Sequence, residues 1–130
     1  MIYKFFDTNA IWQISFDNID FQPVISSITF QELRDIQTAI KNVQADIAID
    51  FYNKIELKLS QCEVWEYKEE MLSIYDSIGI NHITNELKSL ACAFSYDYHM
   101  HPDETVFVTC SIPLAMLANR FFGEDSIEIC

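Results

Sequence analysis

Apolar residues follow two different spacings along this chain. Short apolar runs, which are typical of buried β-strands, stand at residues 2–6, 23–27, 62–67 and 105–109. Between these runs, apolar residues recur every three or four positions, as they do along one face of an α-helix. Such helical stretches cover residues 36–59, 87–94 and 114–121. The pattern predicts strands and helices in alternation, with a further helix at 68–79 and a short edge strand at 126–129.

The alternation of strands and helices indicates the fold class. Parallel strands need crossover connections, which are usually helices, and these helices cover both faces of the sheet. We therefore expect an α/β fold with three layers, α/β/α, around a mostly parallel central sheet. The 130 residues are enough for one domain that buries most of its apolar surface. Residues 1–130 are predicted to form a single domain because no linker-like stretch divides them.

Turn residues and capping residues mark the predicted helix ends. The first long helix is expected to begin near Thr29, and the stripe at 36–59 fits one long helix or two shorter ones. Gly79 is expected to end a helix, since glycine commonly follows a helix C-terminus. Thr84 or Asn85 can cap the helix that follows.

The charge balance is strongly acidic. Lys and Arg total 8 against 20 Asp and Glu, which gives a formal net charge of −12. A chain with this charge repels a phosphate backbone unless cations intervene or its few basic residues gather on one face. If the protein handles nucleic acid, a metal ion is expected to take part.

The lengths of the apolar runs and the spacing of the cysteines indicate where in the cell the protein is expected. No apolar run approaches the ~18 residues that a membrane span requires, and the first residues do not form a secretory signal. We therefore expect a cytoplasmic protein without membrane contact. Cys62, Cys92, Cys110 and Cys130 do not have the paired spacing of a zinc site. In a reducing compartment these four residues are expected to be free thiols.

A carboxylate stands at the end of the first apolar run. In the stretch "MIYKFFDTNAIWQI", Asp7 follows five residues with the pattern of a buried strand. Burying an isolated carboxylate is costly, so Asp7 is expected to have a compensating partner. One interpretation is that Asp7 or Asn9 caps a helix that starts at this point. The other is a metal-binding or catalytic role, and Asp7 alone does not decide between them.

Two further acids occupy comparable places. Glu32 is expected in the opening turn of the helix after the second strand, and Glu86 in the first turn of the helix in "NELKSLACAF". Carboxylates at helix N-termini also favour the helix dipole, so each alone has a structural explanation. However, parallel strands place their carboxyl ends at one edge of the sheet, where ligands gather. Asp7, Glu32 and Glu86 are therefore candidates for a site that holds Mg²⁺ or Mn²⁺, hard cations that select oxygen ligands.

These motifs carry a family resemblance. The chain resembles a PIN domain, a nuclease-like fold found in the toxin half of bacterial toxin–antitoxin pairs and in RNA-processing enzymes. The resemblance lies in "FFDTNAI", "ITFQELRD" and "TNELKSLACA", and "VFVTCSIPLAMLANRFFG" is similar to the family's last strand and helix. In the third motif, Glu86 stands where the family usually has Asp. The motifs are short, and their order and spacing across nearly the whole chain make the resemblance specific.

The resemblance implies a function and its partners. It implies an endoribonuclease that hydrolyses RNA phosphodiester bonds with a metal-activated water, with Asp7, Glu32 and Glu86 as catalytic metal ligands. The implied cofactor is Mg²⁺ or Mn²⁺, and the implied substrate is single-stranded or structured RNA. An antitoxin-like protein partner and a homodimer are further expectations.

The sequence departs from the family pattern after the last long strand. Family members commonly have a fourth acid there, in Thr-Asn-Asp, whereas this chain has Thr109, Cys110 and Ser111. Ser111 can order a water or cap the next helix, but it adds no negative charge. A second metal site is therefore weakened more than the first. The departure favours an alternative function, a PIN-like binding or scaffold module with weakened catalysis.

Residues near the three acids have candidate supporting roles. Thr8 and Asn9 are expected to orient a metal-bound water or to satisfy turn backbone, and Thr109 and Ser111 to support the site from the last strand. Four basic residues are candidate phosphate contacts: Lys4, Arg34, Lys88 and Arg120. Among them, Arg34 and Lys88 follow two residues after Glu32 and Glu86, so they are the expected substrate contacts. His99 and His101 are predicted to lie in a solvated loop away from the site.

Overall fold

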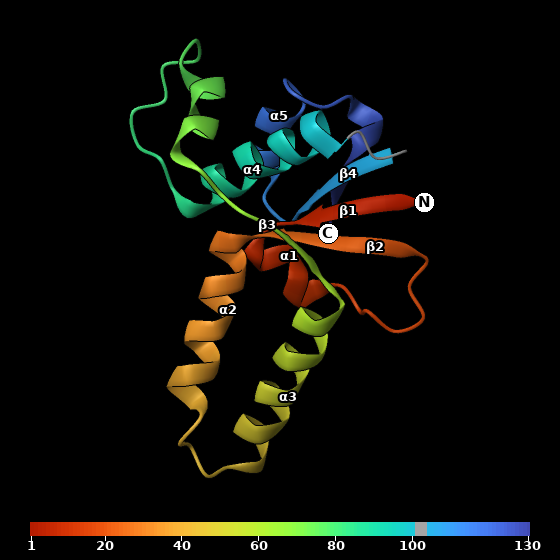
Figure 1. Ribbon diagram of the computed structural model, residues 1–130, viewed down its shortest axis with the longest axis vertical. Helices are drawn as coiled ribbons and strands as arrows, with labels where there is room; N and C mark the ends of the chain where they lie inside the picture. The colour runs from red at the N-terminus through yellow and green to blue at the C-terminus, as the bar shows by residue number, and fades with distance from the viewer. Residues whose placement is uncertain (101–103) are drawn as a thin grey trace.

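Five strands form the central sheet of the computed structural model, which describes residues 1–100 and 104–130 (Figure 1). The strands are β1 (Ile2–Phe6), β2 (Phe21–Ser26), β3 (Glu63–Trp65), β4 (Glu104–Thr109) and β5 (Ile127–Ile129). Their order is β3-β2-β1-β4-β5, and all neighbouring strands are parallel. The parallel sheet and the edge position of β5 confirm the sequence-based predictions.

Helices cover both faces of this sheet. They are α1 (Thr8–Gln13), α2 (Ser27–Ile40), α3 (Asp46–Gln61), α4 (Asn85–Met100) and α5 (Ile112–Ala118). Two 3₁₀ segments, η1 (Glu69–Tyr75) and η2 (Glu124–Ser126), lie in the connections. In Figure 1, α4 and α5 lie on one face of the sheet and α1, α2 and α3 on the other. The fold is therefore the predicted three-layer α/β/α arrangement.

The strand side chains supply two hydrophobic cores. Successive residues of a strand point to opposite faces, so neighbours in β1 belong to different cores. Phe5 packs with residues of α4 and α5, whereas Phe6 packs with residues of α1, α2 and α3. Val24 and Ile25 of β2 divide in the same way. Burial on both faces explains why these strands are almost continuously apolar.

The structure decides one open prediction and shifts two predicted helix boundaries. The apolar stripe at 36–59 forms two helices, and Val43 and Ile47 of that stripe are exposed because the α2–α3 hairpin extends away from the sheet (Figure 1). The first long helix begins at Ser27, capped by Ser26, and not near Thr29. The segment predicted as a helix at 68–79 contains η1, a 3₁₀ helix that ends at Tyr75. Gly79 follows in a left-handed turn with φ of 74°.

The prediction of four free thiols was wrong for Cys110 and Cys130, which form a disulfide. Cys110 follows β4 and Cys130 follows β5, and Thr109 is paired with Ile129 in the parallel register. The next residues of the two strands are therefore opposite each other, with 4.7 Å between their Cα atoms. The strand register brings these cysteines together, although 20 residues separate them along the chain. Cys62 and Cys92 are free.

We expect the two free thiols to react slowly with iodoacetamide in the native protein. Burial raises the pKa of Cys62 and that of Cys92 to about 12, so very little of the reactive thiolate is present at pH 8. Reduction followed by alkylation should therefore label Cys110 and Cys130 first, which peptide mass spectrometry can measure. Rapid labelling of Cys92 before reduction would contradict this assignment.

Across residues 1–100 and 104–130, no helix has the length and apolar character needed to span a membrane.

Candidate functional site

Strand register places three polar residues side by side at the carboxyl edge of the sheet. Phe6 is paired with Ile25 of β2 and with Val108 of β4. The residues that follow these three are Asp7, Ser26 and Thr109. All three are buried, with relative exposures of 1%, 0% and 0%. The parallel topology therefore gathers one carboxylate and two hydroxyl groups at this edge.

Asp7 has a hydrogen-bond donor for each carboxylate oxygen. Its Oδ1 accepts from the backbone N of Ala10 at 2.8 Å, which makes Asp7 the N-cap of α1. Its Oδ2 accepts from Thr109 Oγ1 at 2.5 Å. Two donors that include a backbone amide compensate a buried carboxylate well. The helix-cap interpretation of Asp7 is confirmed, and the oxygen lone pairs that these donors leave keep a metal-binding role open.

Glu32 lies next to Asp7's neighbour, Thr8. Because α2 begins at Ser27, Glu32 is the sixth residue of that helix and not in its opening turn as predicted. Thr8 Oγ1 donates to Glu32 Oε1 at 3.1 Å and lies 2.9 Å from Thr29 Oγ1. Thr8 therefore connects the start of α1 with the acid on α2. This contact holds one oxygen of the Glu32 carboxylate beside Thr8.

Glu86 approaches the same segment from α4. It lies in the first turn of that helix, as predicted, and its carboxylate is exposed. Thr84 Oγ1 accepts from the backbone N of Leu87 at 3.2 Å, so Thr84 is the capping residue of the two that were predicted. Asn9 Nδ2 donates to Glu86 Oε1 at 3.4 Å. Three consecutive residues, 7 to 9, thus supply or contact all three candidate acids.

Thr109 and Ser111 hold the loop between β4 and α5. Thr109 Oγ1 accepts from the backbone N of Ser111 at 3.1 Å while it donates to Asp7. Ser111 is the N-cap of α5, because its Oγ accepts from the backbone N of Leu114 at 3.3 Å. The capping role that the sequence offered for Ser111 is confirmed.

A buried set of hydroxyl groups near the acids was not predicted from the sequence. Ser26 Oγ accepts from the backbone N of Thr29 at 3.1 Å and lies 3.1 Å from Ser89 Oγ on α4. Thr29 in turn contacts Thr8, which holds Glu32. Ser26, Thr29 and Ser89 therefore connect β2, α2 and α4 under the candidate site. Ser26 as an N-cap was the sequence signal that could have revealed this set.

The acids do not form a closed metal cage. Within the part of the chain that the structure describes, no three His, Cys, Asp or Glu side chains are grouped closely enough to hold a metal ion. The predicted convergence of Asp7, Glu32 and Glu86 is therefore incomplete: Thr8 and Asn9 hold the two glutamates. The donor chemistry still fits a hard divalent cation, because all three acids offer oxygen. Mg²⁺ in particular commonly keeps several waters and uses one or two carboxylates.

The two predicted substrate contacts have different surroundings. Arg34 Nη1 forms an ion pair with Glu56 Oε2 on α3 at 2.6 Å. Hydrogen bonds from Gln37 and Arg34 hold the pKa of Glu56 below its ordinary value. Arg34 is thus used to connect α2 and α3. Lys88 instead lies on α4 with its Nζ 5.6 Å from the centre of the Tyr67 ring, two residues after Glu86.

The structure describes one of the two histidines that were predicted to lie in a loop. His99 lies on α4, where it is exposed, and not in a loop as expected. His101 lies outside the residues that the structure describes. His99 takes part in a second feature of the molecule, a pocket beside α4.

Comparisons with known proteins identify the fold. No protein family model matches this chain, and no curated protein matches it in sequence. A solved structure, described as VapBC2 from Rickettsia felis bound to a DNA fragment from their promoter, contains a similar chain. The TM-score is 0.59, the identity is 18%, and the match covers 99% of this chain and 98% of that chain. This likeness supports the PIN-like fold that the sequence motifs predicted.

Proposed function

We propose that this protein is a metal-dependent endoribonuclease of the PIN type that hydrolyses phosphodiester bonds in RNA. One observation carries the proposal: Asp7 is buried at the carboxyl edge of the central strand, and its neighbours Thr8 and Asn9 contact Glu32 and Glu86. Ligand sites of open α/β sheets lie at this edge. The arrangement therefore places three acids, in family order, around one short segment.

Asp7, Glu32 and Glu86 are the residues that would hold Mg²⁺ or Mn²⁺. When bound, the ion would activate water and stabilise charge on the scissile phosphate. Hydration of the ion suits a site in which only Asp7 is buried, Glu32 is half-buried and Glu86 is exposed.

The other residues of the site position these acids. Thr109 holds one oxygen of Asp7, Thr8 holds Glu32, and Asn9 holds Glu86. Lys88 is the favoured contact for a substrate phosphate because it forms no ion pair with the residues that the structure describes, whereas Arg34 is paired with Glu56. A phosphate contact by Arg34 would require that ion pair to open.

Restoring the fourth acid should increase activity. Ser111→Asp adds a carboxylate to the loop that holds Asp7, and Asp caps a helix as well as Ser does, so α5 should keep its start. We expect Ser111→Asp to raise Mn²⁺-dependent cleavage of a single-stranded RNA about tenfold, because an added ligand strengthens metal capture. Initial rates measured on an end-labelled RNA test this expectation.

The matched control is Ser111→Asn, which retains the cap without the charge. Equal rates for the Asp and Asn variants would show that charge at position 111 does not contribute. An inactive parent together with an inactive Ser111→Asp variant that binds Mn²⁺ would favour the alternative function.

That alternative is a PIN-like binding or scaffold module with weakened catalysis. Two observations favour it: Ser111 replaces an acid, and the described acids form no three-ligand group. A divalent ion that binds preferentially to the folded protein must raise its melting temperature. Absence of a Mn²⁺-dependent shift, combined with unimpaired RNA binding, would support the module and contradict the nuclease.

The proposed partners of the protein follow from the likeness to the solved structure. RNA is the proposed substrate, and an antitoxin-like protein is a proposed partner because the similar chain belongs to a structure described as VapBC2. A homodimer and a cytoplasmic location remain part of the proposal, and in a reducing cytoplasm Cys110 and Cys130 would be thiols.

A further inference from the structure

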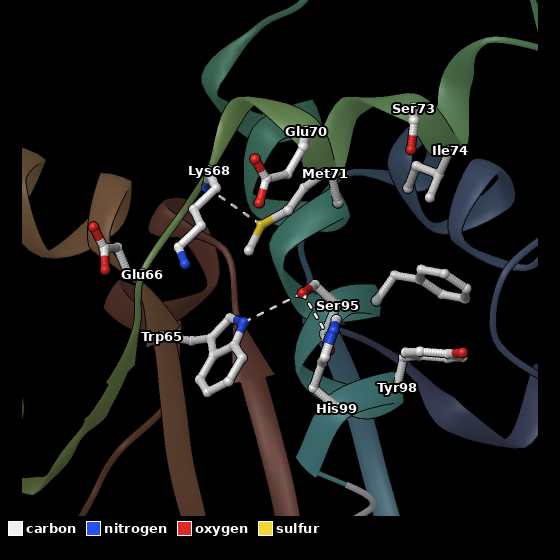
Figure 2. A pocket seen from close by; sticks show the side chains of 12 residues that line it. Trp65, Glu66, Lys68, Glu70, Met71, Ser73, Ile74, Ser95, Tyr98 and His99 are labelled. Carbon is white, nitrogen blue, oxygen red and sulfur yellow. Dashed lines mark hydrogen bonds between the residues drawn. The ribbon is translucent and has the colours of Figure 1, made fainter.

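A pocket of about 500 Å³ lies between η1 and α4. Figure 2 shows Lys68, Glu70 and Met71 on one side of it and Trp65, Ser95 and His99 on another. Its volume falls in the range of small-ligand sites, about 300–1,000 Å³. The pocket is therefore large enough for one nucleobase with its ribose.

Aromatic and apolar residues make up half of the twelve residues that line the pocket. Trp65 packs edge-on against buried Tyr96, with 5.4 Å between ring centroids, and its Nε1 lies 3.5 Å from Ser95 Oγ. These contacts fix the indole ring. Phe94 and Met71 contribute further apolar surface. A planar aromatic ligand gains from stacking in such surroundings, as bases do in single-strand binding proteins.

Among the charged residues that line the pocket, the two carboxylates outnumber the single ammonium group of Lys68, which favours a ligand that donates hydrogen bonds. His99 Nδ1 lies 2.9 Å from the carbonyl oxygen of Ser95. In the tautomer that donates to this carbonyl, Nδ1 carries the proton and Nε2 is an acceptor. The carboxylates of Glu66 and Glu70 are acceptors too, and they disfavour a phosphate inside the pocket. An exocyclic amino group of a base matches this set.

Helix α4 carries residues of both the candidate catalytic site and the pocket. Ala91, which lines the pocket, is five residues after Glu86, a rise of about 7.5 Å along the helix and a turn of about 140° around its axis. Between them, Lys88 lies over the ring of Tyr67, the residue between the pocket residues Glu66 and Lys68. Lys88 and Lys68 thus offer positive charge to a backbone that passes from the acids to the pocket.

We propose that this pocket binds a nucleobase with an exocyclic amino group, on the RNA strand whose scissile phosphate lies at the three acids. The inference rests on the proposed endoribonuclease function and specifies where its substrate is recognised. Cytosine fits better than uracil, because it presents an amino donor where uracil presents a carbonyl. The acidic residues accept from the base while the phosphates stay outside.

Fluorescence of Trp65 tests base binding without metal or cleavage. A Trp12→Phe background makes Trp65 the sole tryptophan, and Phe keeps an aromatic ring against Phe51. In EDTA, cytidine should change the emission saturably, and uridine should bind at least fivefold more weakly. His99→Leu should weaken cytidine binding about tenfold through loss of an acceptor. His82→Leu, an exposed histidine outside the pocket, should bind cytidine like the parent.

A flat cytidine titration would overturn the inference, whether or not the protein cleaves RNA. Emission changes with the peptide acetyl-Lys-Phe-Lys-amide but not with cytidine would also overturn it, and would identify a docking site for a basic protein segment. In a parallel cleavage assay, His99→Leu should raise KM on cytosine-containing RNA about tenfold, and an unchanged KM would remove the pocket from the substrate path. Saturable cytidine binding by a protein that cleaves no RNA would instead contradict the proposed function and leave the base site standing.

Discussion

Asp7→Ala is expected to lower the free energy of unfolding by about 3 kcal/mol. The substitution removes the N-cap of α1, which is worth about 1 kcal/mol, and the partner of the buried Thr109 hydroxyl. A hydrogen bond to a buried charged group adds about 2 kcal/mol. Urea unfolding monitored by circular dichroism measures the change.

Two controls separate these contributions. Asp7→Asn keeps an oxygen that can cap α1, so its loss of stability should be smaller than that of Asp7→Ala. Asp17→Ala, at an exposed position shortly after α1, should change the unfolding free energy by no more than about 0.5 kcal/mol. If Asp7→Ala were as stable as the parent, the hydrogen bonds of Asp7 would not contribute as described.

Loss of the disulfide should have an effect of similar size. Cys110 and Cys130 enclose α5, η2 and β5 in a loop with a sequence separation of 20. Closing a loop of this length in the unfolded chain corresponds to about 3 kcal/mol of stability. Cys130→Ser is therefore expected to lower the melting temperature by roughly 10 °C.

Dithiothreitol supplies the matched comparison for this prediction. It should lower the melting temperature of the parent and leave that of Cys130→Ser unchanged. If the parent gains two thiols on reduction and still melts at the same temperature, the cross-link does not stabilise the fold.

Strand positions were predictable because burial on both faces leaves a clear signal in the sequence. The runs around Phe5 and Phe107 are apolar since each strand supplies both cores. Asp7 and Glu86 were placed correctly because each stands directly at a strand or helix end. Glu32 was placed one turn too early, since Ser26 and not a later residue caps α2.

Features that depend on tertiary structure could not be read from the sequence. The disulfide follows from the register of β4 and β5, which brings together residues distant along the chain. The hydroxyl set around Ser26 needs α4 to lie over β2, and the pocket needs η1 to lie beside α4. The partners of the glutamates, Thr8 and Asn9, likewise depend on how the helices pack.

The most direct measurement is cleavage of an end-labelled single-stranded RNA by the parent, Asp7→Asn and Asp17→Asn in parallel, with Mn²⁺ and with EDTA. We expect the parent and Asp17→Asn to cleave the RNA at equal rates with Mn²⁺ and not to cleave it with EDTA. Asp7→Asn should lose at least about 100-fold in rate, because one uncharged ligand replaces the only buried acid of the site. Cleavage by Asp7→Asn at the rate of the parent, or cleavage by the parent that persists in EDTA, would contradict metal-dependent hydrolysis at Asp7.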